Sequence, residues 1–197
     1  MTGTMRYALT LALLTFAGAS AARAQGSSQS AMAADEETTM VGGQPMFRTR
    51  DIVDNAVSSA DHTTLVSAVK AAGLVETLKG SGPFTVFAPT NAAFAALPEG
   101  TVPALLGPKN KQQLTQVLTY HVVPGRHDAA GLMKAIRKGH GKASLTTASG
   151  EMLWIMMNGE RNVVVRDAKG GVANISTYDV VQSNGVIHVV DRVLLPS

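Results

Sequence analysis

The apolar residues in the first half of the chain recur with helical spacing. They do so between residues 52 and 57 and again between 65 and 72, after which Gly73 can end the helix. The same spacing predicts a helix around residues 114–118. Asp128 can cap a further helix that runs to about residue 138. We therefore expect the first half of the chain to be mainly helical, in short segments.

The pattern changes to strands in the second half. One early strand is predicted at residues 84–88, stopped by Pro89, with Thr90 or Asn91 able to cap a short helix. From residue 144 onward, short β-rich runs alternate with Gly-containing hairpin signals. The predicted runs are 145–148, 152–157, 162–166, 172–176, 180–181 and 186–190. Helices followed by an antiparallel meander predict an α+β fold.

The amino-terminal 24 residues have the pattern of a secretory signal peptide. Arg6 supplies positive charge, a short apolar run follows, and a small-x-small site precedes Gln25. The alternative is a membrane anchor that stays uncleaved, although the run is too short to span a bilayer. We expect cleavage before Gln25 and a secreted or periplasmic protein that has no transmembrane segment once the leader is removed.

The mature chain divides into a tether and one domain. Residues 25–45 are rich in Ser, Ala, Gly and Thr, a composition that predicts a flexible tether. Residues 46–197 have the size of a single domain with its own core. Two of the 17 basic residues lie in the leader, which leaves 15 against 14 acids. This near-neutral balance gives no reason to expect a nucleic-acid partner.

Three sequence elements connect the chain to a known family. The first is residues 85–91, with Phe94 and the Leu97–Pro98 pair after it; the second is residues 120–125, Tyr-His-Val-Val-Pro-Gly; the third is residues 184–191, followed by Leu-Leu-Pro. Their order and spacing resemble those of the fasciclin domain over nearly all of residues 46–197. The details are most similar to single-domain secreted bacterial fasciclin proteins.

The resemblance implies both a fold and a role. It implies a β-wedge of two sheets with short flanking helices, and noncatalytic adhesion to cell-surface or matrix components. In animal members of the periostin kind, the tyrosine–histidine neighbourhood has been linked to integrin contact, and Tyr120 and His121 occupy it here. We expect both residues to be structural and do not transfer the integrin partner.

The residues themselves give no support for catalysis or for a metal. The chain contains no cysteine, which excludes disulfides, thiolate zinc sites and cysteine nucleophiles. Ser67 and Lys70 match an S-x-x-K motif, but no K-T-G motif accompanies them. The five histidines form no tight ligand pattern. We expect no enzyme activity, no cofactor and no metal site.

A basic helix is the first candidate for partner binding. Residues 126–142 hold five cations against one acid, and helical geometry separates an apolar face from a basic one. The candidate residues are Arg126, Lys134, Arg137, Lys138 and Lys142. The plain alternative is a solvated outer face. The functional interpretation is contact with an acidic polysaccharide or an anionic lipid.

A Met- and Trp-containing strand is the second candidate. Residues 152–157 are apolar on both strand faces, and alternation places Met152, Trp154 and Met156 on one side. The plain alternative is a central strand that is buried on both faces. The functional interpretation is a groove for a hydrophobic small molecule, either a lipid or a carotenoid-like compound. The sequence leaves the partner and the oligomeric state open.

Overall fold

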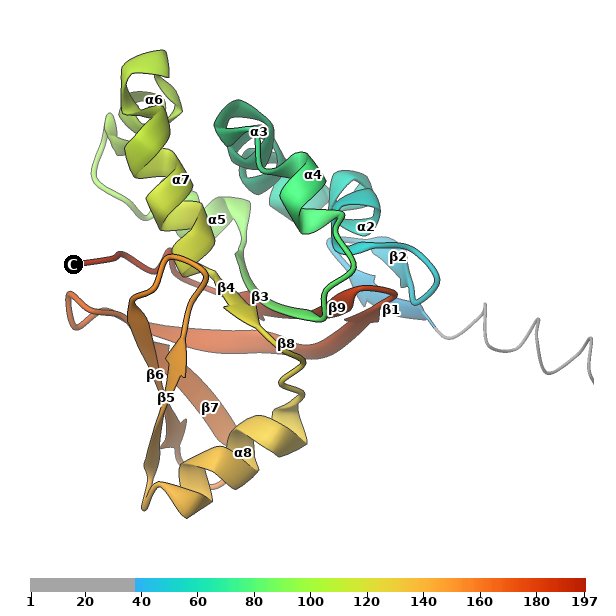
Figure 1. The fold of residues 1–197 in the computed structure, drawn as a ribbon, viewed down its shortest axis with the longest axis vertical. Coiled ribbons are helices and arrows are strands. Elements are labelled where there is room, and N and C mark those ends of the chain that lie inside the picture. The colour runs from blue at the N-terminus through green and yellow to red at the C-terminus, as the bar shows by residue number, and fades with distance from the viewer. Residues whose placement is uncertain (1–37) are drawn as a thin grey trace, which may run out of the picture. The chain divides into compact units, whose positions relative to one another are not determined.

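A seven-stranded mixed sheet organises residues 38–197, the part of the chain that this computed structural model describes (Figure 1). The strands follow the order β4-β3-β9-β8-β7-β6-β5, and every neighbouring pair is antiparallel except β3 with β9. Their bounds are β3 (Phe84–Pro89), β4 (Val122–Pro124), β5 (Lys142–Thr146), β6 (Met152–Asn158), β7 (Asn162–Arg166), β8 (Val172–Gln182) and β9 (Gly185–Val190). The predicted α+β class and C-terminal meander are confirmed.

Short helices cover the sheet in two unequal groups (Figure 1). The larger group precedes and follows β3, whereas α8 packs by itself against β5 and β6. The helices are α2 (Ile52–Ser58), α3 (Thr63–Ala72), α4 (Val75–Leu78), α5 (Asn91–Ala95), α6 (Thr101–Leu106), α7 (Lys111–Tyr120) and α8 (Ala129–Lys138), with 3-10 turns at Ala60–His62 and Pro108–Asn110. No helix within residues 38–197 has the length and apolar character needed to cross a membrane.

The predicted helix ends are confirmed at three positions. Thr90 accepts a hydrogen bond from the Ala93 amide at 3.2 Å and caps α5. Asp128 accepts one from the Gly131 amide at 2.7 Å and caps α8. Gly73 ends α3 with a left-handed φ of 76°, a conformation that L residues with a β-carbon rarely adopt.

The folded region begins earlier than the sequence predicts. Residues 38–45 were expected in the tether, but β1 (Thr38–Val41) pairs antiparallel with β2 (Gln44–Phe47) in a separate two-stranded sheet. Val41 and Met46 are buried and belong to the core. Gly42 and Gly43, whose composition is typical of a tether, therefore form the turn of a β-hairpin. The predicted signal peptide and residues 25–37 of the tether lie outside the described residues.

Strand β8 is longer than either run predicted for it. The runs 172–176 and 180–181 form one strand of 11 residues, whose pairing with β9 shifts register twice. Asp179, at the second shift, has a φ of 54°, which interrupts the alternation that a sequence pattern detects. The amino-terminal part of β8 pairs with β7 and the rest mainly with β9, so one strand joins the two halves of the β-wedge.

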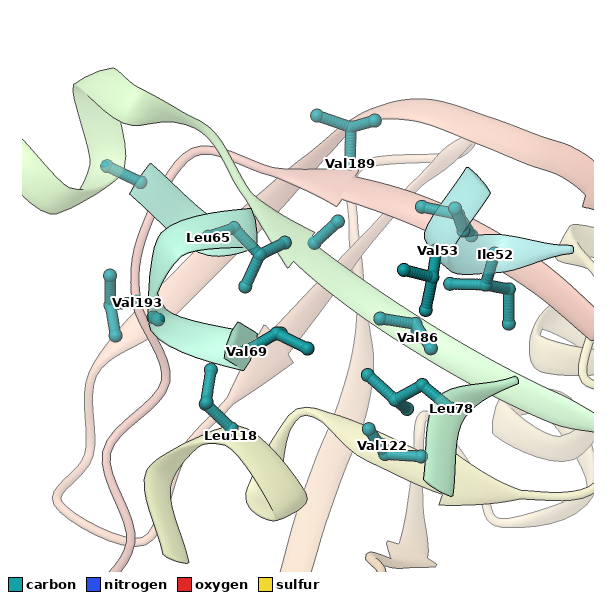
Figure 2. Close-up of a cluster of buried hydrophobic side chains, with 14 of the residues drawn as sticks. Ile52, Val53, Leu65, Val69, Leu78, Val86, Leu118, Val122, Val189 and Val193 are labelled. Atoms are coloured by element: carbon teal, nitrogen blue, oxygen red, sulfur yellow. The ribbon is translucent and has the colours of Figure 1, made fainter. Parts of the chain in front are cut away.

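Strands β3 and β9 are buried on both faces and separate two cores. Val86 and Ala88 face one cluster of apolar side chains, whereas Phe87 between them faces the other. The helical core lies among α2, α3, α4, α7 and β3, and Figure 2 shows Val69, Leu78, Val86 and Leu118 among its side chains. The second cluster, which we call the sheet core, lies between α8 and the inner faces of β5–β8.

The turn before β9 attaches the helices to the sheet. The Asn184 side chain accepts from the Ile52 amide at 3.0 Å and donates to the Leu78 carbonyl at 2.8 Å. A β-carbon on Gly185 would collide with the carbonyl oxygen of Phe84. The Asn-Gly pair therefore allows the parallel strands to approach closely while it holds α2 and α4 in place.

Candidate functional site

Tyr120 is buried and connects α7 to β6 and to the turn between β7 and β8. It ends α7, and its hydroxyl donates to the Met152 carbonyl at 2.9 Å and accepts from the Ala168 amide at 2.9 Å. Burial raises the pKa of the Tyr120 hydroxyl to about 12. Its ring is fully covered, so Tyr120 offers no surface to a partner in this conformation.

His121 is equally enclosed. It is the C-cap of α7, and its ring Nδ1 donates to the Val117 carbonyl at 2.7 Å while Nε2 accepts from the Leu194 amide at 3.0 Å. Burial lowers the pKa of His121 to about 4, so the ring is neutral at neutral pH. His121 therefore connects α7 to the C-terminal segment and has no nitrogen left for a ligand.

His188 occupies a similar position within the sheet core. Its Nε2 donates to the His127 carbonyl at 2.8 Å, and Nδ1 accepts from the Asp179 amide at 3.3 Å. The ring stacks on Phe87 with centroids 5.7 Å apart and meets the edge of Tyr178 at 6.0 Å. Burial lowers the pKa of His188 as well. Its role is to hold the segment before α8 against β9.

The remaining histidines are scattered. His62 is buried and bonds Ser59 at 2.8 Å through Nδ1, whereas His127 is half-buried and His140 is exposed. Within residues 38–197, no group of three or more histidine, aspartate and glutamate side chains is close enough to hold a metal ion.

The basic side of α8 is exposed to solvent. Leu132 and Ile136 point into the sheet core, while Lys134, Arg137 and Lys138 face solvent, as the helical spacing predicts. No ion pair joins these three cations to an acid of the described chain. The helix itself is firmly held, because Asp128 caps the Gly131 amide and Asp179 accepts from the Ala129 amide at 2.8 Å.

The predicted basic group is divided by the sheet. Lys142 on β5 alternates with the inward-facing Ala143 and Leu145, so its side chain lies on the face opposite α8. There its ammonium nitrogen lies 5.4 Å from the centroid of the Trp154 ring. Arg126 is exposed in the loop before α8. Lys142 therefore belongs with the Trp154 strand, and the compact cationic surface consists of Lys134, Arg137 and Lys138.

The Trp154 strand is half-buried, unlike the plain alternative of a strand covered on both sides. Leu153 and Ile155 are fully buried in the sheet core. Met152 is 49% exposed, and Trp154 and Met156 are partly exposed on the outer face. Across the register, Trp154 lies opposite Ser144 on β5 and Arg166 on β7. Met152, Trp154 and Met156, which we call the Trp154 strip, therefore line the outer face of β6, with Ser144 and Arg166 beside them.

The sequence did not predict an apolar cavity inside the helical core. The cavity has a volume of about 90 Å³ and lies among α2, α3, α4, α7, β3 and β4. Its lining includes Ala56, Val69, Leu78 and Leu118, with Lys70 at the helix α3 side. Helical periodicity identified Ala56, Val69 and Leu118 as apolar helix positions, whereas α4 and its Leu78 were not predicted. The packing of these side chains together depends on how four short helices meet.

Known proteins resemble this chain over most of its length. The sequence model of the Fasciclin domain matches residues 60–196. Protein sll1483 of Synechocystis is 44% identical over 167 residues, which are 84% of this chain and 84% of that protein. Protein sll1735 of the same organism is 41% identical over 145 residues, which are 74% of this chain and 97% of that protein.

One solved structure supports the fold independently. It is a FAS1 domain pair from the insect cell adhesion molecule fasciclin I, with a TM-score of 0.66 and 19% sequence identity. The similarity covers 74% of this chain and 51% of that chain. At this identity the likeness concerns the fold alone.

Proposed function

This chain belongs to the fasciclin family, and on that premise we propose that it is a noncatalytic binding module for cell-surface or matrix components outside the cytoplasm. The insect relative of the same fold is a cell adhesion molecule. Tyr120, His121 and His188 support a binding module over an enzyme, because their polar atoms are committed to hydrogen bonds inside the protein.

The basic side of α8 is the surface that we propose for binding. One observation carries this choice: Lys134, Arg137 and Lys138 are exposed together on a rigidly capped helix and have no acidic partner among the described residues. Three uncompensated cations on one helix face attract a multivalent anion. The partner that fits is an acidic polysaccharide or an anionic lipid surface.

Charge reversal tests this proposal. Replacing Lys134, Arg137 and Lys138 with glutamate changes the net charge by six units and leaves Leu132 and Ile136 in place. We expect the unmodified protein to bind immobilised alginate or phosphatidylglycerol vesicles at low salt. Binding should weaken as the Debye length falls from about 10 Å at 0.1 M salt to 3 Å at 1 M. The triple variant should not bind.

A matched variant separates the surface from the overall charge. Lys109, Arg161 and Lys169 are exposed outside α8, and their replacement with glutamate changes the charge by the same amount. This control should keep most of its binding. Equal loss in the two variants, or no binding by the unmodified protein, would contradict a specific role for α8.

The outer face of β6 is the second candidate. The exposed Met152 beside Trp154 favours it, because an apolar strip on a sheet surface suits contact with a hydrophobic molecule or a partner. Trp154→Ala should then abolish the binding of a lipophilic compound and leave alginate binding unchanged. Equal binding by this variant and the unmodified protein would remove the Trp154 strip from consideration.

Localisation follows from the leader. We propose cleavage after residue 24 and release into the periplasm or the medium, because the small-x-small site directly precedes Gln25. Amino-terminal sequencing of the exported protein should read Gln-Gly-Ser. Recovery of the intact Met1 form in the membrane fraction would contradict export as a free protein.

A further inference from the structure

The cavity in the helical core is lined mainly by apolar side chains, which suits the binding of an aliphatic chain. Its walls are made chiefly of Ile, Val and Leu side chains from α2, α3, α4 and α7, and Phe84 and Val86 of β3 contribute to the lining. Ala56, Val66, Leu74 and Val75 in this lining are only half-buried, so the space lies close to the surface between the helices.

Two polar side chains in the lining, His121 and Thr119, already have hydrogen-bond partners inside the protein. His121 uses Nδ1 for the Val117 carbonyl and Nε2 for the Leu194 amide. The Thr119 hydroxyl donates to the Thr115 carbonyl at 2.8 Å. Because a buried water needs two to four polar partners, this cavity is unsuited to water and suited to an apolar occupant.

The cavity is bordered by positive charge at the end of α3. Lys70 contributes to the lining and is exposed, and it forms no ion pair with an acid of residues 38–197. Lys111 reaches the same helix end, since its Nζ would lie 3.6 Å from a β-carbon at Gly73. Asp51 and Asp54 on the α2 side share Lys79 as ion-pair partner, at 3.5 and 2.6 Å, and Glu76 is exposed outside the lining.

We propose that this cavity binds the hydrocarbon chain of a fatty acid, with the carboxylate beside Lys70. The apolar walls fit the chain, and the unpaired lysine fits the anionic head. This site lies in the helical core, away from α8 and from the outer face of β6. It stands independently of the binding function proposed for α8.

The volume sets the expected dependence on chain length. A cavity of about 150 Å³ holds benzene, so 90 Å³ holds about three or four carbon atoms on the same scale. The rest of a longer chain would follow the half-buried side chains toward Lys70. Each methylene that becomes buried should raise the affinity about fourfold, until the enclosed space is full.

Calorimetric titration with short fatty acids tests the site. We expect affinity to rise from butanoate through hexanoate to octanoate. Ala56→Leu adds three carbon atoms to the cavity wall and should lower octanoate affinity at least tenfold. Val57→Leu lies next to it on the exposed side of α2 and should bind like the unmodified protein. Val69→Phe is a second blocking variant on α3, for use if Ala56→Leu does not fold.

Charge variants test the position of the head group. Lys70→Glu should weaken octanoate binding at least tenfold and leave 1-octanol binding unchanged. Lys169→Glu, an exposed charge reversal in the turn between β7 and β8, should change neither. The α8 triple variant should bind octanoate normally, so failure at this site is distinguishable from failure of the α8 proposal.

Three outcomes would overturn the proposal. The first is octanoate binding that Ala56→Leu and Val69→Phe both leave unchanged while the proteins stay folded. The second is equal loss of octanoate and 1-octanol binding in Lys70→Glu. The third is binding to phosphatidylcholine vesicles that is lost in Ala56→Leu, without any binding of free octanoate, which would assign the cavity to a membrane lipid.

Discussion

The two cores of this domain are built from similar side chains, but they differ in how completely the side chains are buried and packed. Leu132, Leu153 and Ile155 in the sheet core are fully buried, whereas Leu65 and Leu78 in the helical core each remain 8% exposed. The helical core also contains the 90 Å³ cavity. A continuous sheet with one helix packed across it fills space more completely than several short helices that meet one another.

The difference also appears in how each core is fastened. The sheet core contains side-chain hydrogen bonds from Tyr120, His188 and Tyr178 to the backbone of neighbouring elements. The helical core depends on attachments at its borders, such as Asn184 and the bond between Asn55 and Gln182. The sheet core is therefore held by hydrogen bonds within it, whereas the helical core is held at its borders and contains the cavity.

Truncation of one leucine in each core should give the largest contrast. Leu153→Ala removes contacts on all sides and should lower the free energy of unfolding by about 4 to 5 kcal/mol. Leu78→Ala should cost about 2 to 3 kcal/mol, because one side of Leu78 already borders empty space. Urea unfolding at neutral pH measures both values. Equal losses would contradict the difference in packing.

His121, which lies between the two cores, should make the stability of the protein sensitive to acid. Its pKa is about 4 in the folded protein, against 6.5 for an unperturbed histidine, so the unfolded chain takes up a proton first as pH falls. Its stabilising effect is complete above pH 6.5 and is lost between pH 6.5 and 4, with about 2 kcal/mol gone at pH 5.

The variant His121→Ala isolates this effect from those of His62 and His188, whose pKa values are also lowered by burial. At pH 7 it should cost about 1 to 3 kcal/mol, because the Val117 carbonyl and the Leu194 amide lose their partner. The difference in free energy of unfolding between the variant and the unmodified protein should be about 2 kcal/mol smaller at pH 5 than at pH 7. If this difference did not change with pH, the pKa of His121 would not be lowered in the folded protein.

Adding volume should have opposite effects in the two cores. Ala173→Leu inserts three carbon atoms into the fully buried sheet core and should destabilise the protein by about 1 to 3 kcal/mol. Ala56→Leu makes the same change beside the cavity and should be neutral or stabilise the protein by up to about 1 kcal/mol. Thermal unfolding of both variants is the measurement. Destabilisation of similar size in both would show that the cavity cannot accept a side chain.

The smallest change should come from the surface of α8, outside both cores. Replacing Lys134, Arg137 and Lys138 with glutamate should alter stability by no more than about half a kcal/mol for each position. Chemical unfolding checks this value and also validates the binding assay. A larger loss would mean that these cations support the helix, and the variant could not then report on binding alone.

The sequence predicted the elements better than their assembly. Helical spacing located α2, α3, α7 and α8, and the Gly-containing turns located β5 to β7 and β9, because each signal is local. The hairpin β1–β2 was missed because its composition resembles a tether. Helix α6 was missed because Pro103 lies inside it, although only at its third position, where proline costs little.

The candidate sites differ in how far they depend on the three-dimensional arrangement of several helices and strands. The exposure of the α8 cations follows from the period of one helix, so the sequence could predict which side chains face solvent. Lys142 was placed with them because it is close in sequence, but strand alternation turns its side chain to the opposite face. The cavity required the joint geometry of four helices, and no periodicity within a single segment contains that information.

The parallel pairing of β3 with β9 also has a consequence for folding kinetics. Val86 and Ile187 pair although they are 101 positions apart, whereas β5 to β9 are joined by short local turns. Local contacts form faster than distant ones because closing a long loop costs entropy. We expect the β5–β9 meander to form first and β9 then to capture β3. The helical core closes last on this route, and a fatty acid present at that moment could enter before the helices settle.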